Sequence, residues 1–253
     1  NPMWRIDLFG GVDWFDAEFD DGAFMDGYNT QEQLQKRIGV SGTWDYAMGY
    51  IKLIVQHSAL NRDIAGNYAT KYDGSTLYTE INHKHEFNSN LTLLSGLNFQ
   101  RIGYEEDKLV SKDTTSFTII DPYFSVLFSL PSGFNVHAGV RVNNHSNYGS
   151  KLIYNFNPSW VFRASRQTRV KLFASASTSF IAPTLFQLHT TWGGNLNLQP
   201  EESFNSEYGV SFYASSKLTL TAVNFFRQER NIVGYTFQYE NIDAVRNVKG
   251  VTL

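Results

Sequence analysis

The sequence predicts an all-β fold in which about 12 strands form an antiparallel up-and-down meander. Three observations lead to this fold class. Apolar and polar side chains alternate along many segments, long and short connections alternate strictly, and the predicted strands are longer than the roughly 5–6 residues typical of globular sheets. No apolar run reaches the roughly 18 residues that a membrane-spanning helix needs. A chain with this pattern is either soluble or crosses a membrane as strands.

The clearest alternation lies in "FNVHAGVRVN", residues 134–143. Val136 and Val140 fall on one face of an extended strand, while His137 and Arg141 fall on the other, which is a period of two. Similar alternation and intervening turn residues divide the rest of the chain. The predicted strands are 3–15, 32–45, 49–60, 75–88, 90–103, 116–130, 134–144, 150–164, 168–180, 202–214, 217–229 and 239–253.

The connections between these strands differ in length according to the end of the meander. Short turns are expected at 46–48, 89, 131–133, 165–167 and 215–216, and longer connections at 16–31, 61–74, 104–115, 145–149, 181–201 and 230–238. In a meander every second connection emerges at the same end, so all the long ones share one end. Short turns at one end and long loops at the other are typical of a transmembrane β-barrel of the outer-membrane type. Strands of about 11–15 residues exceed the ~9–11 that cross a bilayer when tilted. We therefore interpret residues 1–253 as a single β-barrel domain portion.

A soluble or surface-attached β-sandwich that binds a carbohydrate or a protein is the alternative. In such a module the apolar faces of the strands would form a core between two sheets. The polar faces, however, carry charged residues along many strands, among them Glu80, Lys84, Arg141, Lys171 and Glu207. Charged side chains on one face of so many strands favour a wall around a water-filled interior.

Composition limits the function classes. The formal net charge is −3 and no basic block occurs, so no nucleic-acid partner is expected. The absence of cysteine excludes disulfides, thiolate metal sites and a cysteine nucleophile. No Gly-x-Ser-x-Gly, His-Glu-x-x-His or phosphate-binding glycine loop is present, so we predict no catalytic residues and no enzyme activity.

Two stretches carry a resemblance to a known family. The segments "SFIAPTLFQL" and "NLNLQPEES", and the closing "YENIDAVRNVKGVTL", resemble the barrel of TonB-dependent outer-membrane transporters. In that family a strand ends in Phe/Tyr-x-Ala-Pro, the external loop returns through Asn-Pro-x-Leu-x-Pro-Glu, and a later strand contains Asn…Lys-Gly-Val-Glu-Leu. The matching residues are Phe180, Ala182, Pro183, Leu185, Asn195, Leu198, Pro200, Glu201, Asn241, Lys249, Gly250 and Val251. Leu196 and Thr252 depart from the pattern, where proline and glutamate are usual.

The resemblance implies a position in the outer membrane of a Gram-negative bacterium, in contact with lipid. It also implies a function, the TonB-dependent uptake of a scarce nutrient, with cobalamin ahead of a ferric siderophore as the ligand. Family members have a 22-strand barrel and an N-terminal plug, through which TonB and ExbB/ExbD drive transport. Because this chain begins in barrel sequence and Leu253 falls within a strand, we expect a fragment that lacks the plug and the C-terminal strands. A smaller closed barrel of about twelve strands is a further hypothesis.

Aromatic and polar side chains on the expected long loops are the candidate ligand-binding residues. Large rings supply contact area at low entropic cost, which suits a bulky planar ligand. The alternative is that these rings form the outer aromatic girdle or pack one loop against another. The candidates are His189, Trp192, Tyr68, Tyr72, Tyr104 and Tyr235.

Two groups of residues raise the question of a metal. The stretch "DWFDAEFDDGAFMDG" places Asp13, Asp16, Asp20 and Asp21 close together, and clustered carboxylates suit calcium, but a solvated acidic loop is the interpretation that we favour. His83 and His85 share one strand face and could reach one metal, but half-polar rings near a turn also suit the membrane interface, which we favour. We expect no required cofactor, and calcium is the one bound metal that we hypothesise.

Overall fold

The computed structural model of the protein describes residues 3–67, 69–107, 116–165, 167–214 and 218–253. The strands are β1 (Met3–Phe19), β2 (Asn29–Tyr46), β3 (Gly49–Ala65), β4 (Thr70–Asn88), β5 (Leu91–Glu106), β6 (Ser116–Ser129), β7 (Phe134–His145), β8 (Gly149–Arg163), β9 (Arg169–Ile181), β10 (Glu201–Tyr213), β11 (Thr219–Arg230), β12 (Val233–Tyr235), β13 (Tyr239–Asn241) and β14 (Arg246–Thr252). The helix is α1 (Leu185–His189). Among the described residues, no helix has the length and apolar character needed to cross a bilayer.

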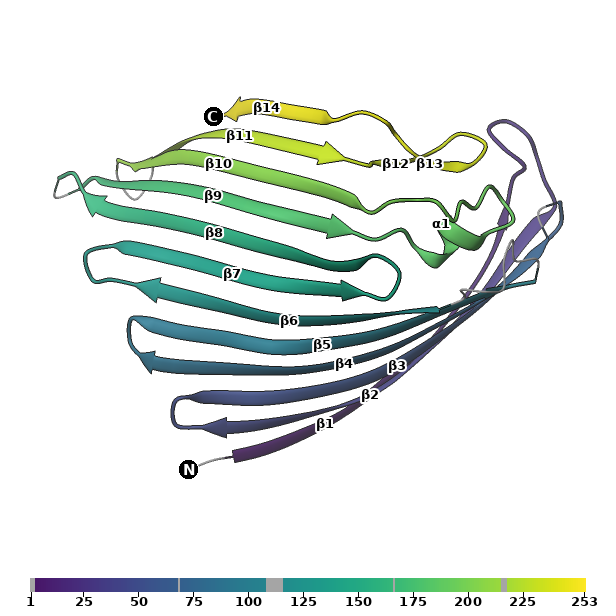
Figure 1. Cartoon of the computed structure of the whole chain (residues 1–253), viewed down its shortest axis with the longest axis horizontal. Coiled ribbons are helices and arrows are strands. Elements are labelled where there is room, and N and C mark those ends of the chain that lie inside the picture. The colour runs from purple at the N-terminus through teal and green to yellow at the C-terminus, as the bar shows by residue number, and fades with distance from the viewer. Residues whose placement is uncertain (1–2, 68, 108–115, 166, 215–217) are drawn as a thin grey trace.

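Twelve of these strands form one curved sheet in sequence order, from β1 to β11 and then β14 (Figure 1). Every neighbouring pair is antiparallel, which confirms the predicted meander. Within the described residues, the strands outside this sheet form only the small β12–β13 hairpin, so the β-sandwich alternative is wrong. The strands β1 and β14 are the two unpaired edges of the sheet. The hypothesis of a smaller closed barrel is therefore also wrong, because closure would require these edges to pair.

The connections largely alternate in length as predicted, but strict alternation is wrong at the β7–β8 connection, because residues 146–148 are fewer than residues 130–133 of the turn before it. The turns after β2, β4, β6, β8 and β10 share one end of the sheet, which we call the inner end. The connections after the odd-numbered strands from β1 to β11 share the other end, which we call the outer end. The predicted turn at 215–216 lies outside the described residues. At the outer end the strands run further than expected, because β1 and β2 pair as far as Phe19 and Asn29, and β3 continues to Ala65. The prediction treated the polar stretches 16–31 and 61–74 as loops. Backbone hydrogen bonding between strands continues through part of these stretches, so the predicted loops were too long.

The last predicted strand, 239–253, was wrong in its first half. Tyr239–Asn241 forms β13, which pairs with β12 in a hairpin at the outer end, and only β14 joins the wall. The amide of Ile242 donates to the carbonyl of Ile232 at 2.8 Å, so the backbone here belongs to the loop and not to the wall. We call residues 231–245, which include this hairpin, the β11–β14 loop.

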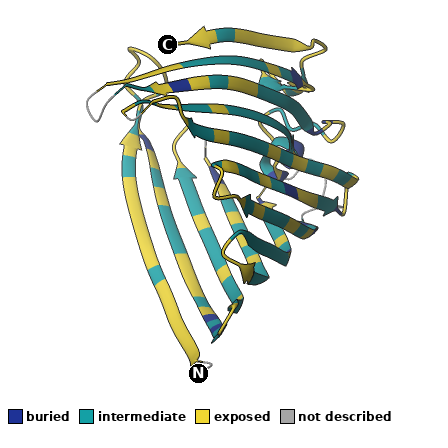
Figure 2. Cartoon of the chain, turned by 90° about the vertical axis from the view of Figure 1, so that its left-hand side faces the viewer, coloured by how far each residue is buried: buried dark blue, intermediate teal, exposed yellow. Residues whose placement is uncertain are grey.

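The two faces of the sheet differ in chemistry. Leu8 lies opposite Val40, and Val40 lies opposite Val55, so apolar side chains continue across strands on one face. Leu8 is 82% exposed within the described chain, and most of the wall is exposed or half-buried (Figure 2). An apolar face without a protein partner suits contact with lipid. The other face is polar and concave, and the loop between β9 and β10 reaches across it to contact Tyr72 of β4 and Glu106 of β5.

A belt of aromatic rings marks the inner end of the apolar face. Trp4 stacks on Trp44 with ring centroids 5.9 Å apart, and Trp44 contacts Tyr46. The hydroxyl of Tyr46 lies 2.7 Å from Nε2 of His83 and 2.8 Å from Nδ1 of His85. Rings of this kind are typical of a membrane interface, as expected for the histidines. In the part of the chain that the structure describes, no group of three or more histidine or acidic side chains is arranged to hold a metal.

Candidate ligand site at the outer end

The connection between β9 and β10, residues 182–200, folds into a compact unit that we call the β9–β10 loop. Its helix α1 begins with a capping box, in which the Thr184 hydroxyl accepts from the Gln187 amide at 3.2 Å and the Gln187 side chain accepts from the Thr184 amide at 2.9 Å. Leu185, Leu188 and Leu198 are buried, and they are three of the four buried apolar residues among those described. The hydrophobic core of the described chain therefore lies mainly in this loop.

Asparagine side chains join this loop to the β11–β14 loop. Asn241 donates to the carbonyls of Gln199 at 2.9 Å and Asn231 at 2.7 Å, and its Oδ1 accepts from the Gln199 amide at 2.7 Å. Asn195 donates to the Tyr239 carbonyl at 2.8 Å, and the Tyr239 amide donates to the Gly193 carbonyl at 2.8 Å. Asn195 and Asn241 both belong to the family-like motifs, and the structure gives each a role in fixing one loop to the other.

The β9–β10 loop also crosses the concave face to β4 and β5. Thr191 donates to Oε1 of Glu106 at 2.7 Å, and Tyr104 donates to Oε2 of the same carboxylate at 2.8 Å. Glu106 is buried at the end of β5, so this carboxylate anchors the loop to the far side of the trough. In Figure 1 α1 lies beside the outer ends of the strands.

An aromatic cluster forms where the loops meet the wall. Phe186 of α1 lies 5.8 Å from Tyr72, 6.2 Å from Tyr104 and 6.2 Å from Tyr239, measured between ring centroids. Tyr235 lies 4.8 Å from Tyr239. Burial raises the pKa of Tyr239 above its ordinary value, with Tyr235 adding to the effect. The structure thus brings together three predicted residues, Tyr72, Tyr104 and Tyr235, through two rings that the sequence did not single out.

The remaining predicted aromatic residues have different surroundings. His189 is 1% exposed, so in this arrangement it packs inside the β9–β10 loop and presents no surface to a ligand. Trp192 is 45% exposed and faces the concave side. Tyr68 lies outside the described residues.

A cavity of about 350 Å³ lies beside Trp192 at the outer end. We call it the Arg62 pocket, and it is lined by Phe19, Gln31, Arg62, Ile64, Tyr72 and Trp192. Sequence reasoning missed Arg62, although its position opposite Tyr72 in the β3–β4 register follows once the strands are extended to their true ends.

The four predicted calcium ligands do not converge. Asp13 and Asp16 lie within β1, three residues apart and hence on opposite faces, and Asp13 pairs with Arg37 at 2.6 Å. Asp20 and Asp21 follow the strand. Side-chain hydrogen bonds from Asn29 and Asn67 hold the pKa of Asp21 below its ordinary value of 3.8. The acidic residues are therefore partly wall and partly loop, and calcium binding stays a prediction.

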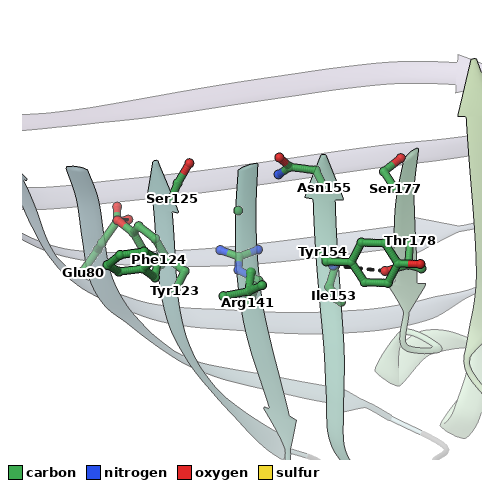
Figure 3. A pocket seen from close by; sticks show the side chains of 12 residues that line it. Glu80, Tyr123, Phe124, Ser125, Arg141, Ile153, Tyr154, Asn155, Ser177 and Thr178 are labelled. Carbon is green, nitrogen blue, oxygen red and sulfur yellow. Dashed lines mark hydrogen bonds between the residues drawn. The ribbon is translucent and has the colours of Figure 1, made fainter. Parts of the chain in front are cut away.

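A second polar cluster lies midway along the concave face (Figure 3). Glu80 accepts hydrogen bonds from Tyr78 and Tyr123, each at 2.7 Å. Tyr123 reaches Glu80 across β5 because Gly96 has no side chain there; a Cβ at Gly96 would clash with the Tyr123 hydroxyl. Arg141 lies over the Tyr123 ring, and the adjacent cavity has a volume of about 450 Å³. This face of the wall is suited to contact a polar partner inside the trough.

Comparison with known proteins places this architecture in a family. A family model described as "TonB dependent receptor-like, beta-barrel" matches residues 3–253. The vitamin B12 transporter BtuB of Vibrio cholerae serotype O1 is 24% identical over 258 residues, which cover 96% of this chain and 38% of that protein. BtuB of Photobacterium profundum is 29% identical over 168 residues, which cover 60% of this chain and 25% of that protein. The chain thus spans well under half the length of these curated relatives.

Solved structures show the same fold. The siderophore receptor PirA from Pseudomonas aeruginosa has a TM-score of 0.77 at 17% identity, and the match covers 98% of this chain and 49% of that one. The copper transporter OprC has a TM-score of 0.76 at 10% identity, with 98% of this chain and 47% of that one covered. The twelve strands of this chain therefore match part of a larger barrel. The chain belongs to the β-barrel family of TonB-dependent receptors, and its sheet is part of a Gram-negative outer-membrane barrel.

Proposed function

We propose that this chain forms part of the wall and of the ligand-capturing outer loops of a receptor that imports a scarce nutrient through TonB. The observation that carries the proposal is the family match over residues 3–253, together with a packed loop assembly that presents rings toward the trough. The packed loops hold these rings in place before a ligand arrives, which lowers the entropic cost of binding.

Cobalamin is the first ligand that we propose, and a ferric siderophore is the second. Curated relatives that match 96% and 60% of this chain are named as vitamin B12 transporters, which supports the first. The resemblance to siderophore receptors is a resemblance in fold, so it supports a ferric siderophore, a ligand of similar size to cobalamin, only as the alternative. Both ligands are large enough to contact several rings of the aromatic cluster at once.

The partners follow from the proposed transport. TonB and ExbB/ExbD would supply energy through a plug domain, which would sit against the polar concave face. The cluster around Glu80 and Arg141 offers hydrogen-bonding groups for such a contact. The apolar outer face would contact outer-membrane lipid.

Growth of a deletion strain tests the function. A strain without the gene should fail to grow when cobalamin is both limiting and required, and should recover when the gene is restored. A gene that carries the substitutions Phe186→Ala and Tyr239→Ala should restore growth poorly, because two central rings are lost. If the deletion strain instead fails only under iron limitation, the ligand is a ferric chelate. Unchanged growth under both limitations would count against uptake of either ligand.

Calcium is a separate proposal at the acidic residues Asp13, Asp16, Asp20 and Asp21. Their placement would have to change for three carboxylates to meet at one ion. Ligand affinity measured with calcium and with a chelator tests this. Equal ligand affinity with calcium and with the chelator would contradict the calcium proposal.

A further inference from the structure

The Arg62 pocket lies on the part of the wall that projects beyond the hydrocarbon layer. On the outward face of β3, apolar residues from Ile51 to Val55 give way to His57 and then to Asn61 and Asp63. Arg62 and Tyr72 lie at the level of these polar residues but on the concave face. The pocket is therefore at the external mouth of the trough, where an incoming solute arrives first.

Among the described residues, no carboxylate forms an ion pair with Arg62. Its Nη2 donates to Oε1 of Gln31, a neutral acceptor. Its Nε is buried and has no hydrogen-bond partner among the described residues, and Arg62 takes part in none of the ion pairs found there. Nearby cations differ: Arg37 pairs with Asp13 at 2.6 Å, and Lys71 pairs with Asp63 at 2.6 Å. A buried donor without a partner is unfavourable unless something binds to it.

Three of the other lining residues carry aromatic rings, and Ile64 adds a further apolar wall. Phe19 comes from β1, Tyr72 from β4 and Trp192 from the β9–β10 loop, so three separate elements surround the guanidinium. The volume of about 350 Å³ falls within the range of small-molecule sites. Flat apolar walls with one cationic fork favour a flat ring that carries negatively charged oxygen atoms.

We propose that the Arg62 pocket binds an oxyanion attached to a flat ring of the transported compound, with Arg62 donating to the oxygen atoms. This inference rests on the proposed uptake function and specifies the chemistry of its ligand. Two sources carry such a group. One is the nucleotide of a complete corrinoid, in which a ribose joins the phosphodiester to the benzimidazole ring, and the other is a catecholate ring of a ferric chelate.

Binding to the purified receptor that contains this chain tests the proposal. The probes are cyanocobalamin, dicyanocobinamide, which lacks the nucleotide, and ferric tris(2,3-dihydroxybenzoate). The substitution Arg62→Gln should raise the Kd of the probe whose oxyanion binds Arg62, either cyanocobalamin or the ferric complex. The expected increase is roughly tenfold to a hundredfold, as for a lost charge-assisted hydrogen bond. Arg62→Lys, which keeps the charge but loses the fork, should recover part of this affinity. Arg101→Gln, an exposed arginine on the outward face of β5, is the matched control and should bind as the wild type does.

The three probes separate the two sources. A loss for cyanocobalamin without a loss for cobinamide identifies the phosphodiester, and a loss confined to the ferric complex identifies the catecholate. An Arg62→Gln receptor that binds every accepted probe with unchanged Kd would overturn the proposal.

Salicylate, a flat aromatic carboxylate, distinguishes failure of the pocket from failure of the uptake function. If the wild type binds none of the three probes, the uptake proposal fails for these ligands. An increase in Tm with salicylate that Arg62→Gln abolishes would still support the pocket. No increase in Tm, or the same increase in the Arg62→Gln variant, would contradict the proposed binding in the Arg62 pocket.

Discussion

Along the wall, Ile6 and Leu8 are 72% and 82% exposed, whereas Leu185 and Leu198 in the β9–β10 loop are 3% and 1% exposed. The usual arrangement of a soluble protein, with a buried core and exposed loops, is reversed here. The wall holds together through backbone ladders between twelve strands and leaves its apolar face exposed, as suits contact with lipid. The loops hold together through their own side chains, as a small globular unit would.

This difference indicates that the stability of the wall depends on its surroundings, whereas the stability of the loops depends on their own side-chain packing. Removing lipid should affect the wall first, because its apolar side chains have no protein partner. Changing a side chain inside the loops should affect the ligand site without affecting the wall. Four predictions test this separation.

The largest expected effect is in the loop core. Leu198→Ala should lower the free energy of local opening of the β9–β10 loop by about 2–5 kcal/mol, because a buried leucine leaves a cavity. Hydrogen exchange of residues 182–200 should speed up while exchange in β3 and β4 stays unchanged. Leu196→Ala, in the same loop but half-exposed, is the control and should have little effect. Equal protection in the two variants would show that the loop has no core of its own.

A charge on the lipid face should weaken the wall. Leu53→Arg lies near the middle of the apolar face of β3 and should destabilise the folded barrel in lipid by about 2–4 kcal/mol. Gln56→Arg lies three residues further along β3, on the concave face, and should cost much less. Urea unfolding in vesicles measures both. Equal losses for the two variants would contradict the assignment of the two faces.

Loss of the asparagine that joins the loops should have a smaller effect. Asn241→Ala removes three hydrogen bonds to the backbone and should lower the free energy of loop opening by about 1–3 kcal/mol. The Gln199 amide, which donates to Asn241, should then exchange faster. Asn197→Ala, which truncates an exposed side chain of the same loop, should leave that amide protected. If both variants exchange alike, the two loops are not joined through Asn241.

The smallest effect concerns pH at the first outer connection. The pKa of Asp21 is lowered in the folded protein, so its stabilising hydrogen bonds are fully present above 3.8 and are lost as the pH falls through the folded value. Cleavage near Phe24 by pepsin should therefore rise at the acidic end of this range. In Asp21→Asn the cleavage should lose this pH dependence, since that side chain does not titrate. A pH dependence that persists in the variant would assign the effect to another group.

Side-chain alternation and turn residues predicted most of the wall. The alternation around Val136 and Val140 predicted one apolar face, and the register of β6 and β7, which places Phe124 opposite Val140 and Phe128 opposite Val136, confirms that apolar face. The strand ends at Phe19 and Ala65 were not predictable in this way, because both faces of a strand that projects into water are polar. The helix α1 was also missed, since five residues are too short for a helical period to show.

The candidate site was predicted only in part. Tyr72, Tyr104 and Tyr235 were identified from their expected loops, but Phe186 of α1 and Arg62 of β3 join them only through contacts between elements distant in the sequence. His189 shows the opposite case, because its sequence neighbours suggest an exposed loop and the folded loop buries it.

By itself, the sequence determined that this chain is an antiparallel wall with one apolar face and with its long loops at one end. These properties depend on local periodicity, which each strand carries within its own residues. Tertiary structure alone decided that the sheet stays open, that the β9–β10 loop crosses to Glu106, and that Arg62 faces a ring-lined pocket. Such features depend on the register and curvature of many strands together, and no single segment contains that information.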